Sequence, residues 1–267
     1  MRVDFIDTHT PYYSQRKFEE KFIPKEKGEP IFKNIKNKDF PKRHLAVLLR
    51  SFKKDTGLNE AIAKYDSAIA YDDCLIGEII NALKEEKVLD STIIFFFSDH
   101  GESFLEHDMF FNHIGLYDNV MNVPVIISGP SLPKNKIVNA LVQLEDLVPS
   151  VLDLLEINYP EIFFDGKSLV PLISGKKEKN RENIFMEEVY DKKRRAIRTN
   201  KYKYIEILSI EGKTELYDLE KDPLENENIS GKEEEILNKM RLLLEQSVKN
   251  LKDLNEKRRI RRILSKV

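Results

Sequence analysis

The sequence predicts an α/β protein in which a mostly parallel sheet flanked by helices is followed by a small antiparallel sheet with a terminal helix. Residues 93–97 form an uninterrupted apolar run, IIFFF, which is typical of a strand buried on both faces within a parallel sheet. Residues 58–88 carry apolar side chains near every third and fourth position, which predicts a long helix before this strand. Four short runs separated by turns after residue 180 predict the antiparallel sheet.

The remaining elements follow from local patterns along the chain. Residues 2–7 alternate weakly and predict a short first strand, while the lysine-rich residues 17–54 predict a long surface excursion with at most one short helix. A second strand, a second helix, the four strands of the small sheet and the terminal helix are expected at residues 122–130, 144–155, 183–190, 195–200, 203–208, 214–219 and 233–254. We therefore assign residues 1–180 to the α/β domain and residues 181–267 to the small sheet with its helix.

Composition limits the possible partners and location. The chain of 267 residues has 44 basic and 46 acidic side chains, a net charge of −2, so no overall field favours nucleic acid or acidic lipid. A basic cluster at residues 257–262 can bind polyanions, but a solvated helix end explains it better. No stretch reaches the roughly 18 apolar residues of a membrane span, and the N-terminus is not a signal peptide, so the chain as it stands is expected to be cytoplasmic.

A polar segment, Ser-Asp-His-Gly-Glu at residues 98–102, stands where the predicted buried strand ends. Ligands bind at the carboxyl ends of strands in open α/β sheets. Asp99 and His100 offer an oxygen and an imidazole that suit Ca²⁺, Mg²⁺, Mn²⁺ or Zn²⁺ in different mixtures. The alternative is an ordinary turn, since Asp-His-Gly is a reasonable turn sequence.

Three further histidines are candidates for the same site. His107 and His113 follow His100 closely, and His9 ends the predicted first strand. Taken alone, His9 is better explained as a loop histidine without a role, because histidine is often only partly buried.

Four segments resemble motifs of one family. They are DTHTPY at residues 7–12, YDSAIAYDD at 65–73, SDHGE with EH, LYD and VP at 98–124, and the pair IRTNKYKY and ELYDLEKDP at 197–204 and 215–223. In this order they resemble the C-terminal part of a sulfatase in the alkaline phosphatase superfamily, and the match spans residues 7 to 229. The resemblance implies an alkaline phosphatase-like fold, present in part, and a sulfate ester as the substrate.

The resemblance also implies roles for individual residues. Asp99 would be a carboxylate ligand of a divalent metal, with Ca²⁺ expected first and Mg²⁺, Mn²⁺ or Zn²⁺ as alternatives, and His100 would be a second ligand. His113 matches a basic residue that contacts the sulfate oxygens, and His9 matches a histidine that binds the sulfate or assists the leaving oxygen. His107 belongs to the motif's glutamate-histidine, for which a structural role is expected.

The chain departs from the family in lacking the nucleophile motif, Cys or Ser followed by x-P-x-R, whose residue is converted to formylglycine. Cys74 is followed by Leu-Ile-Gly-Glu and lies inside the predicted helix. We therefore expect no nucleophile in this chain. It would be a fragment, a half-enzyme that needs a separate chain carrying the N-terminal half, or a remnant that acts as a binding protein. Within the superfamily, a phosphoric or phosphonic ester hydrolase or a phosphoethanolamine-type transferase is the alternative activity.

Overall fold

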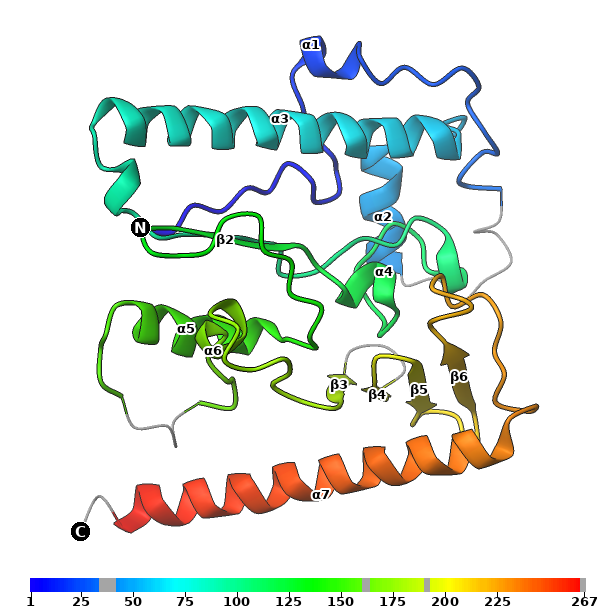
Figure 1. Ribbon diagram of the computed structural model, residues 1–267. Coiled ribbons are helices and arrows are strands. Elements are labelled where there is room, and N and C mark those ends of the chain that lie inside the picture. The colour runs from blue at the N-terminus through cyan, green and yellow to red at the C-terminus, as the bar shows by residue number, and fades with distance from the viewer. Residues whose placement is uncertain (34–41, 160–163, 190–192, 265–267) are drawn as a thin grey trace. The chain divides into compact units, whose positions relative to one another are not determined.

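The structure is a computed structural model that describes residues 1–33, 42–159, 164–189 and 193–264 (Figure 1). The chain divides into two compact units. The first unit contains Met1–Ile94 and Glu102–Asn112, and the second contains Phe95–Gly101 and His113–Val267. This grouping follows spatial contacts, and the domain boundary at residue 180 stays a prediction.

The first unit is built around the long helix α3, Leu58–Glu85, close to the predicted range. Its first turn is held by Glu60, whose Oε2 accepts a hydrogen bond of 2.9 Å from the backbone N–H of Gly57. A single-turn helix α1, Arg16–Glu19, packs against α3, and the 3₁₀ turn η2, Leu89–Ser91, leads towards the first strand.

The lysine-rich residues 17–54 contribute more to the core than the sequence predicted. The helix α2, Lys42–Ser51, and the segment before it place Ile31, Leu48 and Phe52 in a buried cluster with Ala61, Phe110 and Phe111. Leu48 lies in the helix and Phe52 directly follows its last residue, where the N–H of Phe52 donates to the carbonyl of Leu48, so both side chains can enter the same cluster. The interpretation as a solvated surface excursion was therefore wrong for these residues.

The predicted strand at residues 2–7 is also absent from this described part of the chain. Val3 is 47% exposed and Ile6 is 71% exposed. The segment instead ends in a turn, in which the N–H of His9 donates to the carbonyl of Ile6 and that of Tyr13 donates to the carbonyl of Asp7. Weak alternation over six residues did not suffice, because a strand needs a neighbouring strand to satisfy its backbone.

The α/β part of the second unit has a two-stranded sheet of β1, Ile94–Phe97, and β2, Val125–Ser128. Between the strands lies the short helix α4, Asp118–Met121, and after them come the 3₁₀ turn η4, Leu144–Asp146, and the helices α5, Leu147–Leu154, and α6, Val170–Ile173. Phe95, Val125 and Ile127 pack against a cluster of Leu147, Leu169 and Leu172.

The expectation that the first strand is buried on both faces was wrong. No residue of β1 is buried, and Phe96 and Phe97 are 38% and 43% exposed. In β2, Ile126 is 61% exposed. Because side chains alternate between the faces of a strand, the residues that pack on Leu147 leave Phe96 and Ile126 on the opposite face.

The prediction of four strands in an antiparallel sheet is confirmed in the second unit. It contains β3, Ile184–Glu188, β4, Arg194–Arg198, β5, Tyr202–Ile207, and β6, Thr214–Asp218, in the order β3-β4-β5-β6. The long helix α7, Glu234–Leu264, runs past these strands (Figure 1). Its Met240 and Leu244 pack on Ile197, Tyr204 and Leu216, which lie opposite one another in the ladder.

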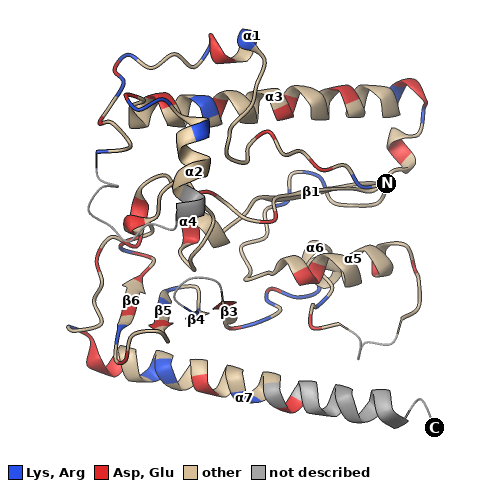
Figure 2. Cartoon of the chain, turned by 180° about the vertical axis from the view of Figure 1, so that it is seen from behind, with Lys and Arg blue, Asp and Glu red and all other residues tan. Residues whose placement is uncertain are grey.

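The charged residues are distributed rather than gathered by sign. Acidic and basic residues both occur along α3 and along the described part of α7 (Figure 2). Among the helices in the described residues, none is long and apolar enough to cross a membrane.

Candidate metal and sulfate site

The loop that follows β1 is held by hydrogen bonds and by a close contact between its backbone and that of residues 119–120. Ser98 Oγ donates a hydrogen bond of 2.6 Å to the carbonyl of His100, and the N–H of Gly101 donates one of 2.7 Å to the carbonyl of Val120. A Cβ atom at Gly101 would lie 2.1 Å from the carbonyl oxygen of Asn119. Only glycine permits this approach, so Gly101 fixes the course of the loop that carries Asp99 and His100.

Asp99 and His100 present one oxygen and one nitrogen close together. Asp99 Oδ1 lies 3.7 Å from His100 Nε2, and the Asp99 side chain is 83% exposed. His100 Nδ1 lies 2.9 Å from the carbonyl oxygen of Gly101. A carbonyl only accepts hydrogen bonds, so Nδ1 carries the hydrogen and Nε2 carries the lone pair of the neutral ring. This is the usual second contact of a metal-binding histidine.

These two side chains fit part of the coordination shell of a divalent metal. A carboxylate oxygen and an imidazole nitrogen are suitable donors. Within the described ranges, no cluster of three or more His, Cys, Asp or Glu side chains could hold an ion. A complete shell would therefore need donors beyond this pair.

His113 lies directly against His100 in the second unit. The two rings stack, with centroids 3.9 Å apart and planes inclined by 21°. The structure therefore brings His113 together with Asp99 and His100, the pair that the sequence predicted as metal ligands. A cation held by the first two would stand beside an imidazole that can donate to an anionic oxygen.

His9 belongs to the first unit, where its ring is held by its neighbour. Its Nδ1 lies 2.8 Å from the carbonyl oxygen of Thr10, so this nitrogen also carries the hydrogen. Thr10 is buried, and the peptide bond between Thr10 and Pro11 is cis. His107 lies in the 3₁₀ turn η3, Glu106–Asp108, with a left-handed backbone at φ 53°. Its structural role stays a prediction.

The sequence did not predict the contacts of Glu102, the last residue of the Ser-Asp-His-Gly-Glu segment. Its Oε2 accepts hydrogen bonds from Tyr12 at 3.0 Å and from Thr10 at 3.4 Å, all within the first unit. Burial, and then the charge of Glu102, raises the pKa of Tyr12. Two separate sequence motifs therefore meet at this carboxylate.

A buried ion-pair network in the second unit anchors the segment that follows His113. Lys203 Nζ, which is fully buried, contacts Asp118 Oδ1 and lies 2.8 Å from Glu225 Oε1. Arg198 Nη2 lies 3.0 Å from Asp118 Oδ2. Burial by itself raises the pKa of Asp118, but Lys203 and Arg198 outweigh burial and lower it. Asp118 therefore stays ionised and binds the small sheet.

Tyr117 makes the neighbouring connection. Its hydroxyl donates a hydrogen bond of 2.8 Å to Glu215 Oε2, which also accepts one of 3.1 Å from Tyr217. Burial, followed by the charge of Glu215, raises the pKa of both tyrosines. The motifs at residues 116–118, 197–204 and 215–223 thus make direct contacts. The sequence did not lead us to predict a role for Glu225, although its position just after the motif at residues 215–223 was a usable signal.

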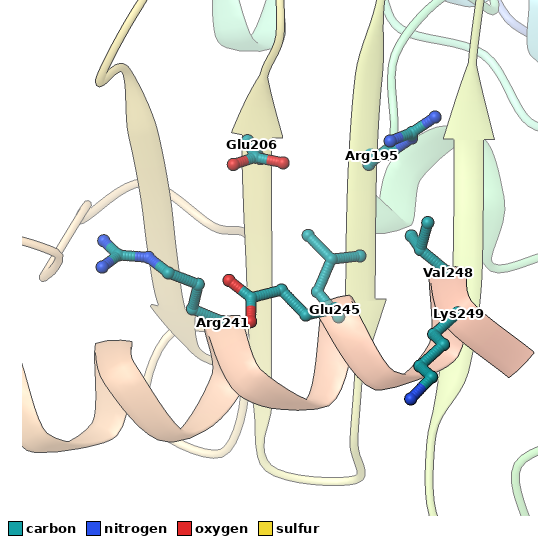
Figure 3. Close-up of a pocket in the computed structure, with 7 residues that line it drawn as sticks. Arg195, Glu206, Arg241, Glu245, Val248 and Lys249 are labelled. Atoms are coloured by element: carbon teal, nitrogen blue, oxygen red, sulfur yellow. The ribbon is translucent and has the colours of Figure 1, made fainter.

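A separate groove lies between α7 and the small sheet (Figure 3). It has a volume of about 270 Å³ and is lined by residues of both signs: Arg195, Glu206, Arg241, Leu244, Glu245, Val248 and Lys249. Figure 3 shows Arg241, Glu245 and Lys249 on the helix, with Arg195 and Glu206 on the strands. None of the predicted site residues lines this groove.

Comparisons with known proteins identify the class. Residues 3–157 match the family model for sulfatases, and residues 106–253 match the model for the C-terminal region of N-sulphoglucosamine sulphohydrolase. In the structural comparison, a 2-O GAG sulfatase has a TM-score of 0.67 and 29% identity over 77% of this chain and 46% of its own. The phosphonate monoester hydrolase of Agrobacterium radiobacter, at 23% identity and a TM-score of 0.68, shares the fold over 93% of this chain and 55% of its own.

The chain belongs to the sulfatase family, a family of hydrolases in the alkaline phosphatase superfamily. Arylsulfatase K from Gallus gallus is 34% identical over 63% of this chain and 33% of its own length. The choline-sulfatase of Rhizobium meliloti is 29% identical over 86% of this chain and 46% of its own length. The chain thus spans between a third and a half of these curated relatives.

Proposed function

We propose that this chain supplies the metal-binding and sulfate-binding part of a sulfuric ester hydrolase. The observation that carries the proposal is the cluster of Asp99, His100 and His113, in which a suitably oriented pair of metal donors lies beside a second imidazole. Sulfatase relatives such as arylsulfatase K and choline-sulfatase support the substrate class.

Hydrolysis of a sulfate ester breaks the bond between sulfur and the ester oxygen, and negative charge develops on the sulfuryl oxygens and on the leaving oxygen. Asp99 and His100 would hold a divalent metal, for which we propose Ca²⁺ first and Mg²⁺, Mn²⁺ or Zn²⁺ as alternatives; when bound, it supplies positive charge that stabilises these oxygens. His113, when protonated, donates a hydrogen bond to a sulfuryl oxygen.

His9 is proposed to contact the sulfate or to protonate the leaving oxygen. Its Nδ1 is bound to the carbonyl of Thr10, so the protonated ring offers the Nε2 hydrogen for this step. The nucleophile, a formylglycine, is proposed to come from an N-terminal sulfatase half, located either in a longer form of this chain or in a separate chain. The 31.3 kDa chain alone should then bind metal but turn over no sulfate ester.

The test combines metal content with an assay on 4-nitrophenyl sulfate. The purified chain is measured alone and after co-expression with an N-terminal sulfatase half that carries formylglycine. We expect turnover only in the complemented sample, and a loss of at least 100-fold in Asp99→Asn and His113→Ala, because each removes charge stabilisation at the reacting group. The control is Asp90→Asn, which changes an exposed carboxylate just before β1 and should leave the rate unchanged.

Each result decides between the alternatives. Turnover by the chain alone would contradict the half-enzyme proposal. Faster turnover of a phenylphosphonate monoester than of the sulfate ester would favour the phosphonic ester hydrolase activity, which the shared fold makes the second candidate. If no sample binds metal or turns over substrate, the result would support the alternative that the chain is a non-catalytic remnant that acts as a binding protein.

A further inference from the structure

We propose that Glu102 is a positioning residue for His9, which holds the His9 ring in a single tautomer through Thr10. The proposal rests on the proposed function in one respect, since it assumes that His9 is the side chain that acts on the sulfate ester. The contacts that carry it lie within the first unit.

The carboxylate of Glu102 joins two loops that are far apart in the sequence. Its Oε2 accepts hydrogen bonds from the hydroxyls of Tyr12 and Thr10, at 3.0 and 3.4 Å, and its Oε1 accepts one of 3.2 Å from the N–H of Ser103. Hydrogen bonds to an ionised acceptor are stronger than neutral ones, and the contact from Tyr12 lies within the usual O–H···O range while that from Thr10 is longer. Glu102 therefore fixes residues 10–12 against the segment that continues the metal-binding loop.

Thr10 passes this constraint to His9. The hydroxyl of Thr10 donates to Glu102, and the carbonyl oxygen of Thr10 accepts from His9 Nδ1, 2.8 Å away. Thr10 is 7% exposed, so water competes little for either group. With the Thr10 carbonyl held in place, the neutral His9 ring keeps its hydrogen on Nδ1 and its lone pair on Nε2.

The chemical consequence is a fixed direction of proton transfer. A histidine with Nδ1 bound to a carbonyl exchanges its catalytic proton only through Nε2, in the way that a third group orients the base of a catalytic triad. Without Glu102, the Thr10 carbonyl can turn and the ring can take the other tautomer. Glu102 would thus act on catalysis although it need not touch the substrate.

The sequence position of Glu102 makes this coupling specific to the site. It follows Gly101 directly, in the same short segment as the proposed metal ligands Asp99 and His100. A purely structural carboxylate would stabilise the fold without affecting the His9 ring.

The experiment observes the His9 ring itself, in the full chain labelled with ¹⁵N-histidine. Nitrogen NMR at about pH 9, where imidazoles are neutral, distinguishes a ring protonated on Nδ1 from one protonated on Nε2. The signals of His9 are assigned with His9→Gln. We expect the Nδ1-protonated pattern in the wild-type chain, and a shift towards a mixture of tautomers in Glu102→Ala and in Thr10→Val.

Two controls separate positioning from general stability. Glu106→Gln changes a second carboxylate of the same loop, which accepts hydrogen bonds from the N–H groups of Phe104 and Leu105, and should leave the His9 pattern unchanged. Thr10→Ser keeps the hydroxyl and should restore the wild-type pattern. If Glu102→Ala does not fold, the comparison of Thr10→Val with Thr10→Ser decides the result.

An unchanged His9 pattern in folded Glu102→Ala and Thr10→Val would overturn the proposal. Titration with inorganic sulfate tests the underlying function separately. If His9 has a fixed tautomer that depends on Glu102 but the complemented enzyme keeps its rate in His9→Gln, the positioning is correct and the proposed role of His9 is wrong. If sulfate moves the His9 signals while the tautomer is independent of Glu102, the proposed role of His9 stands and the positioning role of Glu102 is wrong.

Discussion

At the scale of single residues, Gly101 shows how a steric requirement shapes the candidate site. Its backbone lies so close to Asn119 that a Cβ atom would be 2.1 Å from a carbonyl oxygen. The same glycine donates its N–H to Val120, so the loop after β1 is pinned against the turn before β2. Glycine is required at this position because the loop after β1 packs closely against residues 119–120.

Replacement of Gly101 by alanine should therefore destabilise the fold by about 2 kcal/mol, because one of the two backbones must move. The matched control is Gly77→Ala in α3, where a Cβ atom would meet nothing within 4 Å. That variant should gain about 0.5–1 kcal/mol from helix propensity. Urea unfolding of both variants measures the difference, and equal effects would contradict the steric argument.

Asp72, together with its neighbour Asp7, provides a pH dependence at the scale of single residues. It is 9% exposed on α3, and its Oδ1 has no hydrogen-bond partner within the described part of the chain. Burial, followed by the charge of Asp7 and a hydrogen bond with it, raises the pKa of Asp72 to about 6. The folded state therefore binds this proton more strongly than the unfolded chain, in which the pKa is about 3.9.

Stability should then fall as the pH rises from about 4 through about 6, since the ionised carboxylate is disfavoured in the fold. We expect Asp72→Asn to be more stable than the wild type by about 1 kcal/mol at pH 8 and to lose this advantage at pH 4. Thermal unfolding across this range tests the sign. Asp73→Asn, an exposed neighbour, should show no such trend.

At the scale of elements, the ion pairs of Lys203 determine how α4 is attached to the small sheet. Lys203 on β5 is fully buried between Asp118 and Glu225 and compensates the charge of both carboxylates, with Arg198 as a second partner of Asp118. A buried charge that loses its partner is far more costly than an exposed one. The family motifs that contain Asp118 and Lys203 therefore have a structural reason to occur together.

Lys203→Met should cost about 3–5 kcal/mol at neutral pH, because it leaves two like charges buried together. The cost should shrink below about pH 5, where protonation relieves the repulsion. Lys201→Met is the control: Lys201 is 42% exposed and pairs with Glu220 at 3.2 Å, so its loss should leave the unfolding midpoint nearly unchanged. Similar midpoints for the two variants in denaturant would refute the role of the network.

At the scale of the whole molecule, the near balance of charge leaves little electrostatic repulsion between copies. The net charge is −2 and the isoelectric point is about 6.3. The short strands β1 and β2 also expose apolar side chains, with Ile126 61% exposed. Exposed apolar strands in a weakly charged protein favour association between molecules.

Self-association should therefore be strongest near pH 6.3 and should decrease in Ile126→Lys, which places a charge on the strand. Leu224→Lys introduces the same charge at a residue that is 73% exposed but outside the strands. Light scattering from pH 5 to 8 compares the two. If Leu224→Lys suppresses association equally, net charge rather than the strand is responsible.

The sequence by itself determined most of the regular elements and pointed to the family. The periodicity of α3, the short runs separated by turns in the small sheet and the charged helix α7 are local properties, and the predicted ranges of α3 and of the four strands of the small sheet agree with the structure to within a few residues. Asp99 and His100 were also found locally, because polar residues interrupt an apolar run where a strand ends, whereas the role of His113 came from the family resemblance. Their roles stay predictions.

Only the tertiary structure decided what these residues touch. The ring stacking of His100 and His113, the meeting of Glu102 with Thr10, and the burial of Lys203 each join segments that are distant in the chain. The same holds for the exposure of β1, which an apolar sequence alone placed in a core. Such contacts depend on which surfaces pack together, and a local pattern of side chains does not carry that information.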